Sequence, residues 1–236
     1  KILGPIDIFI SIPELGSIYK SVVKGDRFSE SIISIIYPRT SYKLTEKLHR
    51  DFPDAHKYLS KGHEFDLSSN IFERLSFIFF DKKPRDEFSY IQILGRLKNE
   101  RILKWVRSDY IINHPNLNKY KVFLPKSNGS GAIGEVLSTP LVGGTETFMS
   151  FGAFNCKYDA ESCLKYIKCK FTRAMLGILK ITQDNPVSVW RFVPLQDFST
   201  NSDIDWSQPI ENIDQQLYKK YNLSQDEIDF IESKVR

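Results

Sequence analysis

Residues 90–106 have the sequence YIQILGRLKNERILKWV, and this stretch determines the expected fold at the centre of the chain. Two runs within it, 90–94 and 102–106, are rich in the β-branched and aromatic residues that favour strands. The connection between them, residues 95–100, contains Gly95 and is basic. The pattern predicts a β-hairpin whose connection and flanks carry arginine and lysine.

A second stretch, residues 159–180, predicts one long amphipathic helix. Asp159 is a favourable N-cap residue. Apolar residues then recur at intervals of one, three and four positions, which places them on one helix face. These residues are Ala160, Cys163, Leu164, Ile167, Phe171, Ala174, Met175 and Ile178. The basic residues, among them Lys168 and Arg173, lie off that face, and we expect them to be available to a partner.

The remaining elements follow from the same patterns and predict an α+β fold. Further strands are expected at 31–37, 75–80, 120–124 and 187–192, and helices at 45–59 (interrupted at Pro53), 209–221 and 224–235. Ser224 and Glu227 have the spacing of a capping box at the start of the last helix. We expect mixed strands in the N-terminal two-thirds, then the long amphipathic helix and a helical acidic tail. The predicted domains are 1–200 for recognition and 201–236 for the helical tail.

Composition excludes several classes of protein. With 41% hydrophobic and 13% aromatic residues, the 236-residue chain can bury a sizeable core, unlike a disordered or collagenous chain. It has no run of eighteen apolar residues that would span a membrane. Its three cysteines, Cys156, Cys163 and Cys169, lack C-x-x-C spacing. They indicate a reducing cytoplasm rather than a disulfide framework.

Charge is segregated along the chain. Residues 95–126 contain eight basic and two acidic side chains, a net charge of +6. Residues 157–191 contain seven basic and three acidic side chains, a net charge of +4. From Asp197 onward nine acids face four bases, a net charge of −5. A basic centre with an acidic tail is typical of a face that binds a polyanion, although ordinary solvated surfaces show the same composition.

Four motifs resemble cofactor, catalytic or metal sites but lack the context that such sites need. Residues 129–134, GSGAIG, have the G-x-G-x-x-G spacing of dinucleotide sites, yet Pro140 and further glycines follow where a helix must begin. Asp54, Asp81 and Lys83 imitate the spacing of magnesium-dependent nucleases, a match that is common by chance. Residues 185–188, NPVS, lack the second proline and the aromatic residue of the amino-methyltransferase tetrapeptide. The histidines His49, His56 and His63 recur every seven residues, but a proline and a glycine prevent one helix through them. We therefore expect no bound cofactor or metal.

Ordered blocks between residues 120 and 221 resemble a known family. They are KVFLPKSNGSG at 121–131, GEVLS at 134–138, TETF at 145–148, KYIKCKFTR at 165–173, LGILKITQD at 176–184, WRFVPLQDF at 190–198, SDIDW at 202–206 and IDQQLYKKY at 213–221. In this order they are similar to the C-terminal target-recognition region of bacterial type IIG-like restriction–modification enzymes with an N6-adenine DNA methyltransferase. Residues 1–90 show no such similarity.

The resemblance implies that this chain recognises a DNA sequence without catalytic activity of its own. Its expected partners are double-stranded DNA and the methyltransferase and nuclease domains upstream in the parent chain, and its expected location is the cytoplasm. The residues expected to bind DNA are Arg96, Lys98, Arg101, Lys104, Arg107, Lys121, Lys126, Asn128, Ser130, Lys168 and Arg173. Most would contact phosphates, and a few would contact base edges in the major groove.

Two alternatives remain open at the level of sequence. The first is a fragment that keeps part of a nuclease or methyltransferase site, with Asp54, Asp81 and Lys83 as the candidate residues. The second is a docking module whose acidic tail binds the parent enzyme.

Overall fold

The computed structural model describes residues 10, 12–127, 134–180 and 182–235, and its contacts divide the chain into two compact units. The sheet unit comprises Ile35–Ser127 and Ile133–Glu161. The helical unit comprises Lys1–Ser34, Asn128–Ala132 and Ser162–Arg236. Residues 201–236 thus fold with residues 162–200, and the functional boundary expected at residue 200 stays a prediction.

The first β-sheet of the sheet unit has four strands in the order β1-β7-β4-β5. They are β1 (Ile36–Tyr37), β4 (Tyr120–Pro125), β5 (Val136–Ser138) and β7 (Phe148–Phe154). All neighbouring strands are antiparallel. The strand expected at 120–124 is confirmed, whereas 31–37 becomes a strand only at its end, after the 3-10 helix η1 (Ile32–Ile35).

The second sheet contains the predicted hairpin and has the order β3-β2-β6. Strand β2 (Tyr90–Leu97) pairs antiparallel with β3 (Glu100–Arg107), and β6 (Val142–Gly144) pairs parallel with β2. The turn is only two residues long, Lys98 and Asn99, with φ angles of 49° and 67°. Positive φ at both positions is the geometry that matches the twist of a tight hairpin.

The core of the sheet unit collects side chains from both sheets and from short helices. Helix α2 (Glu46–Asp51) and the 3-10 helix η2 (Pro53–Tyr58) confirm the interrupted helix expected at 45–59, because proline at position 53 cannot continue the α-helical hydrogen bonding. A further 3-10 turn, η3 (Ser108–Tyr110), follows the hairpin. The core includes the completely buried side chains of Leu44, Leu48, Ile71, Leu75, Ile93, Val106 and Phe123.

The strand expected at 75–80 is wrong. Residues Ile71–Arg74 form the short helix α3, and within 75–80 only Phe80 makes a β-bridge, with Trp105. Leu75, Ile78 and Phe79 are buried in a turn between the two. A short apolar run indicates burial as strongly as it indicates a strand, and here Leu75, Ile78 and Phe79 are buried while Phe77 and Phe80 are exposed.

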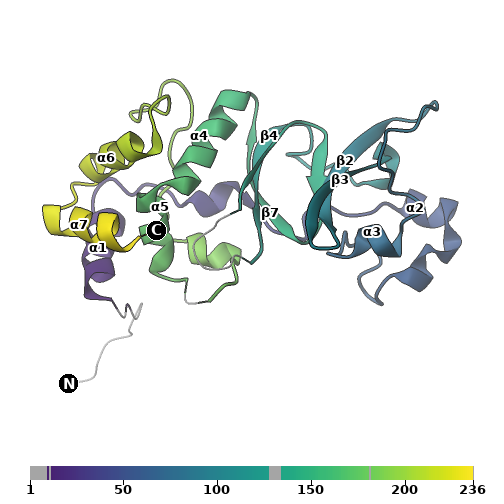
Figure 1. Ribbon diagram of the computed structural model, residues 1–236, viewed down its shortest axis with the longest axis horizontal. Helices are drawn as coiled ribbons and strands as arrows, with labels where there is room; N and C mark the ends of the chain where they lie inside the picture. Colours follow the sequence, from purple (N-terminus) through teal and green to yellow (C-terminus); the bar gives the residue numbers. More distant parts are fainter. Residues whose placement is uncertain (1–9, 11, 128–133, 181, 236) are drawn as a thin grey trace, which may run out of the picture. The chain divides into compact units, whose positions relative to one another are not determined.

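In the helical unit, α1 (Pro13–Val23) packs against α5 (Lys170–Gly177) and α7 (Gln225–Lys234) (Figure 1). Helix α5 also packs against α7 and α6 (Ile210–Lys220). The predicted capping box is confirmed, since the Ser224 hydroxyl accepts from the Glu227 N–H and the Glu227 carboxylate accepts from the Ser224 N–H. The strand expected at 187–192 is wrong, because Val187–Trp190 form the 3-10 helix η4.

The long helix expected at 159–180 is two helices, which corrects the prediction. Helix α4 (Lys157–Lys168) ends where Cys169 adopts an extended ψ of 143°, and α5 begins at Lys170. The Asp214 carboxylate accepts the first two N–H groups of α5, from Lys170 at 3.1 Å and Phe171 at 2.9 Å. A capping acceptor from α6 therefore stabilises a new helix start inside a continuous helical pattern.

The α+β class is confirmed. The named strands all lie between Ile36 and Phe154, and the named helices after that point end with α7 near the C-terminus. Within the described ranges, no helix has both the length and the apolar character needed to cross a membrane.

Candidate nucleic-acid interface

An open groove of about 370 Å³ lies in the sheet unit. Its lining comes from the start of α3, the hairpin turn, the residue after β4 and the residue before β7. The lining residues are Ser69, Asn70, Glu73, Arg96, Lys98, Asn99, Lys126 and Thr147. The groove therefore brings together three of the residues expected to bind DNA, Arg96, Lys98 and Lys126.

Backbone hydrogen bonds from residues 145–147 hold the walls of the groove together. The Thr145 N–H donates to the Leu94 carbonyl of β2 at 2.9 Å, and the Glu146 N–H donates to the Leu67 carbonyl at 2.8 Å, just before α3. The Lys126 N–H donates to the Thr147 carbonyl at 2.8 Å. One short segment thus positions the hairpin, the approach to α3 and the end of β4.

Gly95 lets α3 approach the hairpin closely. A Cβ at this position would lie 2.4 Å from the Phe72 ring and 2.9 Å from the Thr145 methyl group. Phe72 is buried and has little room to move away. The absence of a side chain at position 95 therefore sets the distance between the α3 wall and the hairpin wall.

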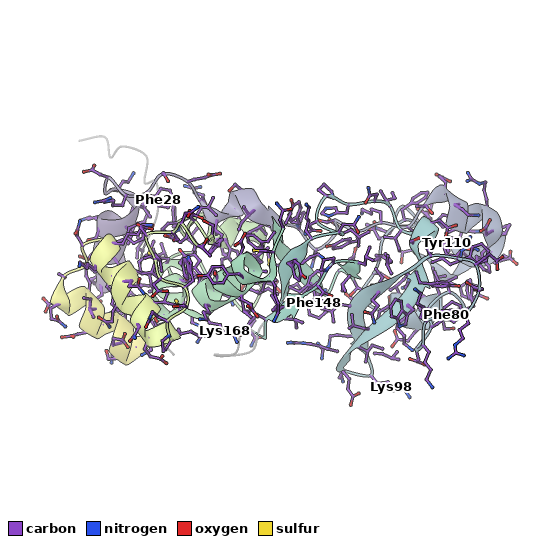
Figure 2. The ribbon with its side chains drawn as sticks, turned by 90° about the horizontal axis from the view of Figure 1, so that it is seen from above. Phe28, Phe80, Lys98, Tyr110, Phe148 and Lys168 are labelled. Atoms are coloured by element: carbon purple, nitrogen blue, oxygen red, sulfur yellow. The ribbon has the colours of Figure 1, made fainter. Side chains whose placement is uncertain are left out.

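Lys98 lies at the outer end of the hairpin, away from Phe80 and Tyr110 (Figure 2). The Arg96 guanidinium donates to the Asn99 carbonyl at 3.0 Å, which ties this side chain to the turn. Lys98 has a positive φ, which is uncommon for a residue other than glycine, asparagine or aspartate. The turn thus keeps a long cationic side chain where glycine would be less strained.

The charges in the groove are not neutralised by one another. Arg96, Lys98 and Glu73 are exposed and Lys126 is half-buried. Within the part of the chain that the structure describes, none of the four forms an ion pair within 4.0 Å. Three cations and one carboxylate give the groove a positive charge that attracts an anionic ligand.

Thr147 adds an unsatisfied polar group. The residue is buried, and its hydroxyl oxygen has no hydrogen-bond partner among the described residues. A buried hydroxyl without a partner is destabilising.

Three other predicted residues on the hairpin have different surroundings. Arg101 pairs with Arg96 in register, and its guanidinium carbon lies 5.9 Å from the centre of the Phe148 ring. Lys104 is largely buried and forms an ion pair with Asp81. Arg107 is largely buried, donates to both carboxylate oxygens of Asp109, and stacks on an aromatic ring, that of Phe88, at 3.6 Å. Arg107 also lies 4.6 Å from the Tyr110 ring. Lys104 and Arg107 thus already have internal partners, and their contact with DNA stays a prediction.

Lys121 is not a surface residue, which corrects its assignment to the DNA-binding set. Its side chain is completely buried, and its ammonium donates to the carbonyls of Lys119 at 2.8 Å and of Leu117 and Thr139 at 3.4 Å. Burial lowers the pKa of Lys121 to about 7. A side chain enclosed in this way does not reach a phosphate.

The remaining predicted residues lie elsewhere. Asn128 and Ser130 fall outside the described residues, as does most of the glycine-rich stretch 129–134. Lys168 at the end of α4 and Arg173 in α5 are half-buried in the helical unit. Their contact with DNA also stays a prediction.

The three candidate residues of a nuclease site, Asp54, Asp81 and Lys83, each contact a different partner. Asp54 forms an ion pair with Lys57 at 2.6 Å, Asp81 forms one with Lys104, and the Lys83 ammonium lies over the Trp105 ring. Asp54 and Asp81 are both exposed. Over residues 10, 12–127, 134–180 and 182–235, no three histidine, cysteine, aspartate or glutamate side chains are grouped to hold a metal ion.

The groove also contains residues that the sequence reasoning missed. These are Ser69, Asn70, Glu73, Asn99 and Thr147. A signal was present at α3, since Asn70 followed three positions later by Glu73 is a typical helix start. The interpretation of 75–80 as a strand concealed that helix. No local pattern indicates that Thr147 and the hairpin turn line the same groove. Pairing between strands that are distant in sequence brings these residues to one place.

Comparison of the chain with protein-family models, curated proteins and solved structures finds no match. Functional assignment therefore rests on the groove and on the ordered sequence blocks.

Proposed function

We propose that this chain binds double-stranded DNA and serves as the target-recognition module of a type IIG-like restriction–modification enzyme. The observation that carries the proposal is the groove in which Arg96, Lys98 and Lys126 converge without forming ion pairs within the described residues. When such cations contact phosphates, the counterions condensed on the nucleic acid are released, and this release favours binding.

The β2–β3 hairpin supplies a suitable shape. A two-stranded ribbon fits the major groove of B-DNA, which is about 12 Å wide. The tight turn at Lys98 and Asn99 gives the ribbon a narrow end. In this arrangement the hairpin end faces the bases, and Lys126, at the end of β4, contacts the phosphate backbone.

The module is proposed to have no activity of its own. In this proposal a nuclease and a methyltransferase act from upstream domains of a parent chain in the cytoplasm, and this chain supplies sequence recognition. Asn128, Ser130, Lys168 and Arg173 remain proposed DNA-binding residues of the module.

The test is the salt dependence of binding to a fluorescent duplex, measured by anisotropy between 50 and 200 mM salt. Neutralising roughly six phosphates gives a slope of log affinity against log salt of about −5. Replacing Arg96, Lys98 and Lys126 together by alanine should weaken binding and reduce the magnitude of the slope by at least about 1, the contribution of the Lys126 phosphate contact. Lys61→Ala is the matched control, because Lys61 is exposed in the same unit but does not line the groove.

Two results would contradict the proposal. A flat titration of the unaltered chain would show that phosphates are not neutralised. An equal change in slope on replacing Lys61 would show that the groove has no special part in binding.

A further inference from the structure

The groove contains a carboxylate where a site for phosphate alone would have none. Glu73 is exposed, lies in the first turn of α3, and shares the groove with Arg96, Lys98 and Lys126. Its carboxylate has no ion pair within the described residues, so the nearby cations do not neutralise it in the unbound protein. A negative charge at this position repels a phosphate.

We infer that Glu73 accepts a hydrogen bond from the exocyclic amino group of a DNA base, the N6 amino of adenine or the N4 amino of cytosine. This inference rests on the proposed function and makes Glu73 a specificity-determining residue of that module. Phosphates have no donor to offer a carboxylate, whereas these two amino groups are the donors that the major groove presents.

The other side chains of the groove are consistent with a base edge. An ionised carboxylate only accepts hydrogen bonds, and the Arg96 guanidinium only donates them. Base pairs present donors and acceptors side by side, so a wall with both kinds of group matches them. Asn70 lies on the same face as Glu73, three residues earlier, and its amide offers one further acceptor and two donors.

The backbone of Glu73 is fixed by its neighbours. Ile71 and Phe72, the two residues before Glu73, are buried in the core of the sheet unit, and the Leu75 N–H donates to the Ile71 carbonyl at 2.9 Å. The Glu146 N–H bond to the Leu67 carbonyl fixes the approach to the helix. A rigid support of this kind is what discrimination between bases requires.

The experiment selects preferred duplexes from a library with randomised base pairs and then measures their affinities by anisotropy. The proteins are the unaltered chain, Glu73→Gln, Glu73→Ala and the control Glu46→Gln. Glu46 is exposed in the first turn of α2 in the same unit and carries the same charge, but it does not line the groove.

The unaltered chain should select an adenine or a cytosine at one position. Glu73→Ala should lose that preference by about tenfold, the usual size of a well-formed contact with a base edge. Glu73→Gln keeps an acceptor oxygen and should favour adenine, whose N6 and N7 a glutamine amide pairs with. Glu46→Gln should keep the preference of the unaltered chain. Circular dichroism checks that each variant is folded.

Base analogues then distinguish the two sources of the amino group. Purine in place of adenine deletes the N6 amino group, and 2-pyrimidinone in place of cytosine deletes the N4 amino group. The unaltered chain should lose affinity for one of the two analogues, and the Glu73→Ala variant should be insensitive to it.

The failures are distinguishable. If the unaltered chain binds duplex DNA but Glu73→Ala keeps its base preference, or if no preference exists, the assignment of Glu73 is overturned and DNA binding stands. If the unaltered chain does not bind duplex DNA, the proposed function and the assignment are both overturned.

Discussion

At the scale of single residues, Lys121 shows how a cation is held inside the sheet unit. Its ammonium donates to three backbone carbonyls, and its side chain lies on the same strand face as Phe123, whose ring centre is 5.8 Å from the ammonium. Desolvation of the charged form lowers the pKa of Lys121 from 10.5 to about 7. The nearby titratable group is His114, whose own pKa burial lowers.

The lowered pKa of Lys121 predicts a pH dependence of stability. In the unfolded chain the ammonium keeps its proton up to its ordinary pKa near 10.5, whereas the folded chain releases it above about 7. The unfolded state therefore binds more protons between pH 7 and 10, and this group makes the protein more stable as pH rises through that window. The slope approaches 1.4 kcal/mol per pH unit at most.

A Lys121→Met variant should lack this rise. Urea unfolding at pH 7, 7.75 and 8.5 compares the two proteins. Cys163 and Cys169, whose thiol pKa values burial raises, contribute a fall in stability toward alkaline pH, but they do so in both proteins. The difference between the two unfolding free energies isolates Lys121, and a difference that does not change with pH would show that Lys121 stays protonated when folded.

At the scale of elements, the corner between α4 and α5 depends on a residue from α6. The Asp214 carboxylate accepts the N–H groups of Lys170 and Phe171, and Phe171 stacks on the Tyr221 ring with centroids 5.0 Å apart. Burial raises the pKa of Asp214 to about 6, despite these two hydrogen bonds. The carboxylate therefore caps α5 from within a poorly solvated site.

Asp214→Ala should destabilise the helical unit by about 1–2 kcal/mol at pH 7, because the first turn of α5 loses its acceptor. The measurement is the midpoint of urea unfolding followed by circular dichroism. Asp229→Ala is the control, since Asp229 lies on the exposed part of α7 and bonds only to Gln225 among its described contacts. An unchanged midpoint in Asp214→Ala would mean that Asp214 does not hold the corner.

The same corner shows why sequence patterns predict some elements and not others. The hairpin and the Ser224–Glu227 capping box have their signals within a few residues, and both are confirmed. The break at Cys169 depends on Asp214, which is remote in sequence and leaves no local signal. The strands expected at 75–80 and 187–192 are wrong, because an apolar run also occurs in a turn or a 3-10 helix that buries some of its residues. These are Leu75, Ile78 and Phe79 in the first segment and Trp190 and Phe192 in the second.

At the scale of the whole molecule, the sequence locates a basic segment, but it does not show which of its cations meet in the groove. The +6 segment contributes Arg96, Lys98 and Lys126 to the groove. The same segment contains Lys104 and Arg107, which form internal ion pairs, and the buried Lys121. Counting charges does not separate these cases, because side-chain direction and partners depend on the folded sheets. Alternation along β4 was a usable signal for Lys121, since it shares a face with Phe123.

The groove is also built from two parts of the sequence, one inside the ordered blocks and one before them. Under the proposed function, Lys126 belongs to the blocks proposed to resemble target-recognition regions, whereas Arg96 and Lys98 lie before them. An element shared by proteins that recognise different sequences is poorly suited to reading bases, while phosphates are the same at every site. We therefore expect Lys126 to position DNA, and the hairpin to discriminate between sequences.

Lys126→Ala should weaken binding to preferred and scrambled duplexes by similar factors and reduce the magnitude of the salt slope by about 1, as loss of one phosphate contact does. Arg96→Ala should instead weaken the preferred duplex more than the scrambled one, because a lost base contact costs about 1–3 kcal/mol at one position. Anisotropy titrations of both duplexes at several salt concentrations measure the two effects together. If Lys126→Ala removed discrimination at one base pair and left binding to the scrambled duplex unchanged, Lys126 would read a base, and the division between positioning and recognition within the groove would be wrong.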